Sequence, residues 1–145
     1  KSMVDIGDLE TLIQRYVETK GIRLVVIDHL HYITSSYREE SEARHIAHCV
    51  RTLNLLCQRF NLGMLIVAHF RKQPDGAHRP SLHEFKDSSA IEQEASTALL
   101  LWRNTTGTPE QQLITELTIA KSRKDVTLGT LKLRFNKKLR TYEPI

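Results

Sequence analysis

The sequence predicts an α/β fold in which helices flank a mainly parallel sheet and an antiparallel hairpin lies near the C-terminus. Residues 24–27 and 63–69 are short apolar runs, and each is typical of a parallel strand that is covered on both faces. The segment between them, roughly residues 40–60, repeats apolar side chains at helical spacing, and no hairpin turn joins the two strands. A strand, a helix and a strand in this order form a βαβ unit.

The composition is that of an ordinary folded domain. The chain has 145 residues, of which 40% are hydrophobic and 26% are charged. A chain of this length can hide roughly two-thirds of its unfolded surface in a core. These figures exclude a disordered chain, a coiled coil and a disulfide scaffold. No apolar run approaches the roughly 20 residues of a membrane span, so we expect no membrane partner.

The N-terminus and the cysteines favour a reducing, cytoplasmic setting. The first residues lack the apolar stretch of a signal peptide. Cys49 and Cys57 lie in a helical pattern, and they suit free buried thiols better than a disulfide bridge.

The sequence also predicts a helix before the βαβ unit and a loop after it. Apolar residues at helical spacing predict a helix over about residues 9–20, which Gly21 ends. Residues 70–80 hold two prolines and an Asp-Gly pair, and they predict an exposed loop rich in basic side chains. Ser81 and Glu84 then match a capping box that opens a short helix.

The second half is dominated by strand patterns. Residues 88–96 favour another helical turn or two, and residues 97–103 form a third apolar run. Residues 113–123 alternate apolar and polar side chains, as a half-buried strand does. Residues 129–136 follow a Thr-Leu-Gly turn, so we expect them to form the hairpin partner of that strand.

The net charge of +4 is unevenly distributed along the chain. Residues 1–45 carry six Lys and Arg against eight Asp and Glu, a balance of −2. Residues 46–145 carry fifteen against nine, a balance of +6. The second part is therefore where we expect a polyanion to bind, and the alternative is a solvated basic surface.

Two polar side chains follow the strands of the predicted βαβ unit. Asp28 ends the first apolar run, and ligands of open α/β sheets bind at this end of the strands. A carboxylate there can hold Mg²⁺ through water beside phosphates. His69 ends the second run, so it should face the same edge and can donate a hydrogen bond to a terminal phosphate. The alternatives are a carboxylate that caps the strand and a surface histidine.

A basic pair ends the last long strand pattern. Lys121 and Arg123 lie two residues apart on this strand, which would direct both side chains to one face. Arg suits bidentate phosphate contacts and Lys adds a point charge, so the pair can act as an arginine finger on a neighbour's phosphate. The alternative is a solvated basic face.

The other histidines do not predict a metal site by their spacing. His29 and His31 are two residues apart, and His45 and His48 are three residues apart with Cys49 adjacent. Neither pair has a third ligand at a known zinc spacing. The six glycines include no G-x(4)-G-K-[ST] phosphate loop.

Four segments together resemble the motor domain of DnaB-type hexameric replicative helicases, which are RecA-like ATPases. LVVIDHLHYI resembles the Walker B strand of this family, and GMLIVAHFRK resembles the segment that ends in its γ-phosphate sensor. RPSLHEFKDSSAIEQEASTALLLWRN resembles the family's RP-x(4)-L-R-x-S-G-x-I-E-Q-x-A-D segment. IAKSRKDVTLGTLKLRFN resembles its K-x-R-x(3–5)-G-x(4)-F-N ending. The resemblance extends over about residues 8–143.

The resemblance implies roles for four residues at the nucleotide. Asp28 would be the Walker B ligand of Mg²⁺. His69 would be the phosphate sensor, a position that is Gln in many bacterial members and where His looks more like the phage primase-helicases and the mitochondrial replicative helicase. Arg123 would be the finger that reaches the nucleotide of the adjacent subunit, with Lys121 beside it.

The resemblance also implies a loop that binds DNA. Lys86, Asp87, Ser88 and Ser89 would form the central-channel loop that holds the backbone of single-stranded DNA, a task that backbone amides and a basic side chain suit. Lys86 replaces the family's usual Arg and Ser89 its usual Gly. Residues 35–38 are a further candidate channel element, and the basic loop before residue 80 can contact phosphates.

The resemblance further implies that the phosphate loop and the catalytic glutamate lie upstream of residue 1. We therefore expect residues 1–145 to be the C-terminal part of a RecA-like helicase ATPase domain, inactive alone and monomeric or dimeric. The parent protein would be an ATP-dependent DNA helicase. With ATP and Mg²⁺ it would move along single-stranded DNA as a homo-hexameric ring, in the cytoplasm or nucleoid of a phage, bacterial or organellar replication system.

Two other functions remain open at this point. One is another RecA-like ATPase, such as a recombinase or a clock-type relative, although the segment KDSSAIEQEAS argues against it. The other is a non-catalytic module for nucleic-acid binding or ring assembly that lacks a phosphate loop.

Overall fold

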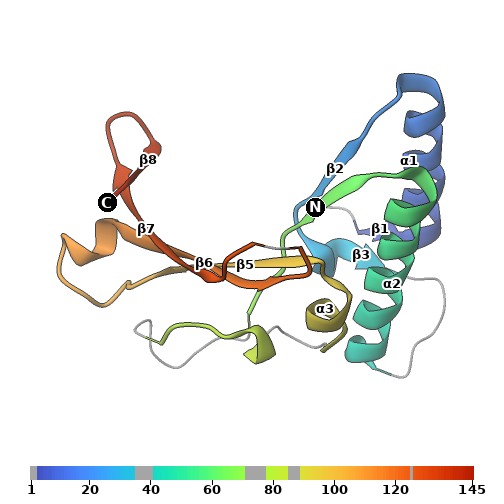
Figure 1. Ribbon diagram of the computed structural model, residues 1–145. Coiled ribbons are helices and arrows are strands. Elements are labelled where there is room, and N and C mark those ends of the chain that lie inside the picture. The colour runs from blue at the N-terminus through green and yellow to red at the C-terminus, as the bar shows by residue number, and fades with distance from the viewer. Residues whose placement is uncertain (1–2, 35–40, 71–77, 85–88, 125) are drawn as a thin grey trace. The chain divides into compact units, whose positions relative to one another are not determined.

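The computed structural model describes residues 3–34, 41–70, 78–84, 89–124 and 126–145. The chain divides into two compact units (Figure 1). The first unit comprises residues 1–69 and 85–94, and the second comprises residues 70–84 and 95–145. No helix in the described part of the chain has the length and apolar character that a membrane crossing requires.

Among its described residues, the first unit contains four short strands in two parallel pairs, together with three α-helices and one 3₁₀ turn. In chain order these elements are β1 (Val4–Asp5), α1 (Ile6–Lys20), β2 (Leu24–Ile27), the 3₁₀ turn Leu30–Tyr32, β3 (Ile33–Thr34), α2 (Glu42–Phe60), β4 (Gly63–Ile66) and α3 (Ser89–Glu94). β1 pairs with β3, and β2 pairs with β4. The order β2, α2, β4 confirms the βαβ unit that the sequence predicts.

Both long helices begin and end at residues suited to those positions. The Asp5 carboxylate accepts a hydrogen bond from the Gly7 N–H at 2.8 Å at the start of α1, and the Ser41 hydroxyl accepts one from the Arg44 N–H at 3.3 Å at the start of α2. α1 ends at Gly21 with φ 64°, and α2 ends at Asn61 with φ 50°. Gly and Asn are the residues that adopt this left-handed conformation most readily.

The core of the first unit is formed by the apolar sides of α1 and α2 and by one face of the β2–β4 pair. Its buried side chains include Ile13 of α1 and Ile46, Leu53 and Leu56 of α2. Val25 and other alternate residues of the strands pack against this core. The two helices lie side by side on this face of the strands (Figure 1).

The opposite face of the β2–β4 pair differs from the prediction. The apolar runs predict strands covered on both faces, whereas Leu24, Val26, Leu65 and Val67 are 40–63% exposed. Because side chains alternate along a strand, these residues point away from the face that α1 and α2 cover. Within the described residues this second apolar face therefore remains open to solvent.

The second unit is built on a four-stranded antiparallel sheet. Its elements are the 3₁₀ turn Leu82–Glu84, β5 (Thr97–Arg103), the 3₁₀ turn Gln111–Leu113, β6 (Ile114–Ser122), β7 (Gly129–Asn136) and β8 (Thr141–Pro144). The strand order is β5-β6-β7-β8, and every pair is antiparallel. The predicted C-terminal hairpin is confirmed as β6–β7, and the sheet extends it by one strand on each side.

The residues around the 3₁₀ turn Leu82–Glu84 form one half of the predicted capping box, and the predicted short helix is this single turn. The Ser81 N–H donates a hydrogen bond to the Glu84 carboxylate, and the Glu84 N–H donates to the Ser81 carbonyl oxygen at 3.2 Å. The bond from the Ser81 N–H, with help from His78, holds the pKa of the Glu84 carboxyl below its usual range. Glu84 therefore satisfies the backbone N–H of Ser81 with its side chain.

One ion pair anchors the segment before this turn to the sheet. Arg79 Nε and Nη2 donate hydrogen bonds to the two carboxylate oxygens of Glu116 at 2.6 and 2.9 Å. The Arg79 guanidinium also lies 4.7 Å from the ring centroid of Trp102. The side chain of Glu116 is only 10% exposed, and the Arg79 hydrogen bonds hold the pKa of its carboxyl below the usual range. A bidentate pair of this kind fixes orientation as well as distance.

The buried face of α2 yields a first prediction. Leu53→Ala should lower the free energy of unfolding by about 2–5 kcal/mol, because Leu53 is 1% exposed and its truncation leaves a cavity in the core. Leu55→Ala is the matched control on the same helix. Leu55 is 64% exposed, so its loss should change stability by no more than about 0.5 kcal/mol. Urea denaturation followed by circular dichroism measures both, and equal effects would contradict the packing described here.

The Arg79–Glu116 pair yields a second prediction, on pH. A carboxyl whose folded pKa is lowered stabilises the native state above its unfolded pKa and loses this contribution as pH falls through the folded value. Glu116→Gln should therefore lower the free energy of unfolding at pH 7. Its difference from the unmodified chain should shrink as pH falls below the ordinary glutamate range of about 4.3.

Urea titrations at a series of pH values measure this effect, and Glu110→Gln serves as the control. Glu110 is exposed and lies in the turn before β6. A stability difference for Glu116→Gln that stays constant from neutral to acidic pH would refute the assigned role of this ion pair.

Candidate functional site

The carboxyl ends of β2 and β4 bring together residues that lie far apart in the sequence. The two strands pair in parallel with Ile27 opposite Ile66. Beyond the strands the pairing continues, because the Val67 N–H donates to the Ile27 carbonyl oxygen and the Leu30 N–H donates to the Val67 carbonyl oxygen, both at 2.9 Å. The segments that carry Asp28 and His69 therefore leave the sheet at the same edge, as their sequence positions predict.

Asp28 is exposed at this edge, directly after β2. Its carboxylate is the kind of hard oxygen ligand that Mg²⁺ binds, and an exposed position leaves room for the waters that Mg²⁺ retains. The residues that follow it, from His29 through the 3₁₀ turn Leu30–Tyr32, turn back toward the core, where Leu30 is 1% exposed. The buried Leu30 thus holds the backbone on which Asp28 and His29 are carried.

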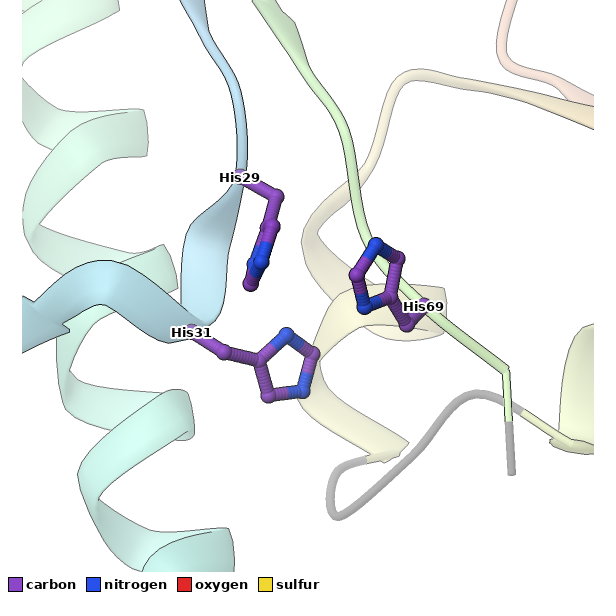
Figure 2. Close-up of side chains that lie close together, drawn as sticks. All are labelled: His29, His31 and His69. Carbon is purple, nitrogen blue, oxygen red and sulfur yellow. The ribbon is translucent and has the colours of Figure 1, made fainter. Parts of the chain in front are cut away.

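Three histidines meet beside Asp28. Figure 2 shows His29 and His31, from the segment after β2, directed toward His69, from the segment after β4. The ring centroids of His29 and His69 are 4.1 Å apart, those of His29 and His31 are 5.6 Å apart, and those of His31 and His69 are 5.9 Å apart. One ligand atom from each ring lies within 4.8 Å of the other two.

This cluster was not predicted from the sequence. His29 and His31 have no third ligand at a recognised spacing along the chain, because His69 follows the neighbouring strand. The signal that could have found it was the parallel pairing itself. Two histidines after one strand and a histidine after its parallel neighbour must emerge at the same edge.

His45 and Cys49 form a separate contact on α2. His45 Nε2 lies 2.9 Å from the Ile33 carbonyl oxygen, and Cys49 Sγ lies 3.7 Å from the same nitrogen. Cys49 and Cys57 are free thiols, as predicted, and burial raises the pKa of the Cys57 thiol. Neither cysteine belongs to the histidine cluster.

Lys121 and Arg123 lie in the second unit, at the end of β6. Lys121 pairs with Ala98 of β5, next to an irregularity in the register between Ala98 and Leu99. Arg123 lies just past the last residue of the strand, and its N–H donates to the Ser96 carbonyl oxygen at 2.8 Å. The two residues were expected on one strand face; the strand instead ends at Ser122, and Arg123 is exposed beyond it.

The predicted DNA-contacting segment is described only in part. Lys86, Asp87 and Ser88 lie outside the described residues, as do residues 35–38, whereas Ser89 is the exposed first residue of α3.

The helix that follows this segment is fixed to α2. Ala90 and Ile91 are buried, and the Asn54 amide of α2 donates to the Glu94 carboxylate at 2.9 Å. Arg51 forms a longer ion pair with Glu94 at 3.7 Å. The end of the segment is thus held against the core of the first unit.

Arg79, one of the basic residues of the loop before residue 80, is engaged within the chain. Its guanidinium binds Glu116, so its forked donors are already directed at a carboxylate. Its structural role is to tie this segment to the sheet of the second unit.

Comparisons with known proteins place this chain among replicative helicases and their domains. A probable plasmid replicative DNA helicase of Chlamydia psittaci is 33% identical over 135 residues, which cover 89% of this chain and 29% of that protein. A probable replicative DNA helicase of Trieres chinensis is 31% identical over 127 residues, which cover 82% of this chain and 28% of that protein. The chain therefore spans less than a third of the length of these two relatives.

Two solved structures share the fold at 23% sequence identity. One is described as a DnaB-like replicative helicase and its interactions with primase; it has a TM-score of 0.82 and covers 98% of this chain and 36% of that chain. The other is described as an ATPase domain, with a TM-score of 0.81 over 96% of this chain and 51% of that chain. Both likenesses confirm the α/β fold class predicted from the sequence.

The family comparison covers almost the whole sequence and confirms the predicted resemblance. The pattern of the family described as "DnaB-like helicase C terminal domain" matches residues 1–144. The chain belongs to the family of DnaB-like helicase C-terminal domains.

Proposed function

We propose that this chain is part of an ATP-dependent replicative DNA helicase motor, which couples ATP hydrolysis to translocation on single-stranded DNA. The observation that carries the proposal is that Asp28 and His69 follow two paired parallel strands at the same edge, in a chain of this family. Ligands of open α/β sheets bind at this edge. Residues 1–145 would form the C-terminal part of the ATPase domain, and another part of the protein would supply the phosphate loop.

Asp28 and His69 would act on the nucleotide bound by the same subunit. The exposed Asp28 carboxylate suits a water-mediated contact to Mg²⁺, which neutralises phosphate charge when it is bound. His69 is exposed at the same edge, and a ring N–H can donate a hydrogen bond to the terminal phosphate. Loss of that acceptor after hydrolysis would release His69, which is how a sensor distinguishes the two nucleotide states.

Lys121 and Arg123 would act on the nucleotide of the adjacent subunit in a homo-hexameric ring. Arg123 is exposed just beyond the end of β6, and a guanidinium at such a position can stabilise the charge that develops during phosphoryl transfer. Lys121 adds a second positive charge near the end of the same strand. ATP would then lie between two subunits, and hydrolysis would depend on their contact.

Lys86, Asp87, Ser88 and Ser89 would hold the DNA backbone in the central channel of the ring. The fixed attachment of α3 to α2 supports this assignment, because a loop that moves DNA must transmit force to the rest of the domain. Ser89 begins this helix, so the segment ends on a rigid element. The activity would belong to DNA replication, in the cytoplasm or nucleoid.

Arg123→Ala in the protein that carries this domain tests the nucleotide half of the proposal. ATP hydrolysis stimulated by single-stranded DNA should fall by at least about a thousandfold, because an arginine finger contributes that much to phosphoryl transfer. ATP binding to the same variant, measured with a fluorescent analogue, should survive. Arg103→Ala is the matched control, since Arg103 is an exposed arginine at the end of β5. A normal rate in Arg123→Ala would refute the finger assignment.

Lys86→Ala tests the DNA half of the proposal. Its affinity for single-stranded DNA should fall uniformly across sequences, because a phosphate contact carries no sequence information. The slope of log affinity against log salt should decrease by about 0.7, the contribution of one phosphate contact to a single strand. Lys20→Ala, which removes an exposed lysine from the last turn of α1, should leave both quantities unchanged. An unaltered salt slope in Lys86→Ala would exclude this contact.

A further inference from the structure

We propose that His29, His31 and His69 form a binding site for one divalent transition-metal ion, represented by Zn²⁺. Among the described residues they are the group whose possible ligand atoms converge, each within 4.8 Å of the other two. Nothing in the predicted roles of the nucleotide site requires three histidines at this position. The cluster is therefore a feature in its own right.

The nitrogen atoms of the three rings lie somewhat farther apart than the ligands of a bound zinc ion. Tetrahedral zinc with Zn–N bonds of 2.0–2.1 Å holds its nitrogen ligands about 3.4 Å apart. The observed limit of 4.8 Å exceeds this by about 1.4 Å, which rotation about the side-chain bonds of three imidazoles can supply. The three rings already lie close together, as Figure 2 shows.

The backbone beneath the cluster is held firmly. The Leu30 N–H to Val67 carbonyl bond ties the segment of His29 and His31 to the segment of His69 at 2.9 Å. Leu30, between the two histidines, is 1% exposed in the core. Metal binding therefore needs only side-chain movement, since the two segments already lie side by side.

The donor set selects the class of metal. Neutral imidazole nitrogens favour Zn²⁺ and similar first-row ions, whereas Mg²⁺ prefers oxygen ligands such as the carboxylate of Asp28. Nδ1 of His29 and both ring nitrogens of His31 are buried, while the residue His69 is exposed. The site thus has buried ligands on one side and access to solvent on the other. A water molecule can be the fourth ligand beside the three histidines.

The contact between His45 and Cys49 is a less suitable metal site than the three histidines. A carbonyl oxygen only accepts hydrogen bonds, so His45 Nε2, 2.9 Å from the Ile33 oxygen, must carry the proton. That nitrogen is the one that faces Cys49 and cannot bind a metal while protonated. A zinc ion bound there would have a thiolate ligand. A thiolate ligand gives Co²⁺-substituted sites a distinct near-ultraviolet charge-transfer band.

Occupation of the cluster has a consequence that rests on the proposed function, although the site itself does not. A metal bound to His69 would hold the ring away from the hydrogen bond that we assign to the terminal phosphate. Zn²⁺ should then inhibit ATP hydrolysis by the protein that carries this domain, and Mg²⁺ alone should not.

Isothermal titration of the 145-residue chain with Zn²⁺, without nucleotide, tests the site directly. We expect one ion per chain, and we expect Co²⁺ to give the visible absorption of a four-coordinate nitrogen site without a thiolate band. His69→Gln should weaken Zn²⁺ binding by more than about tenfold, since even changes behind a metal's ligands cost about 10–100-fold. His83→Gln, which changes an exposed histidine outside the cluster, should bind as the unmodified chain does.

His31→Gln provides a second, independent loss of one ligand, and circular dichroism establishes that each variant is folded. Absence of saturable Zn²⁺ binding would overturn the proposal, as would unchanged affinity in whichever of His69→Gln and His31→Gln folds. A Co²⁺ thiolate band would overturn it in favour of the cysteines. None of these measurements depends on ATP hydrolysis. The helicase function would fail a different test, namely that the protein does not hydrolyse ATP even without Zn²⁺.

Discussion

The parallel pairing of β2 with β4 is the constraint on which the site depends. Four residues of each strand pair in register, and two further hydrogen bonds carry the pairing past the strands to Leu30 and Val67. Because both strands run in the same direction, both of their polar extensions emerge at one edge. Asp28 and His69 lie at the same edge for this reason, and the histidine cluster results from the same geometry.

The helix α2 makes this pairing possible. It links the two strands as a crossover, and its buried side chains cover one of their faces. The same helix holds α3 through Asn54 and Arg51, so the end of the proposed DNA segment and the nucleotide edge share one support. In the second unit the Arg79–Glu116 ion pair has a comparable structural role. It ties the segment before the 3₁₀ turn Leu82–Glu84 to the sheet that contains Lys121.

The elements with strong local signals were predicted well. α1 and α2 follow from apolar stripes at helical spacing and, for α1, from Gly21 at its end. The β6–β7 hairpin follows from alternation and a short turn. The open face of the β2–β4 pair was not predicted, because an apolar run shows that a side chain avoids water without showing what covers it. The end of β6 before Arg123 likewise depends on its pairing with β5, which alternation does not reveal.

Motifs and periodicity were enough to predict the family, the main helices and strands, and the positions of Asp28, His69, Lys121 and Arg123 near element ends. These features are local, because motif spacing, helical periodicity and capping each depend on residues that are close together in the sequence. The short strands β1, β3 and β8 were not predicted. The contact of His69 with His29 and His31 is a product of the fold. It depends on hydrogen bonds between two segments that α2 separates in the sequence. Spacing along the chain does not reveal such a contact, because register between strands is set by packing.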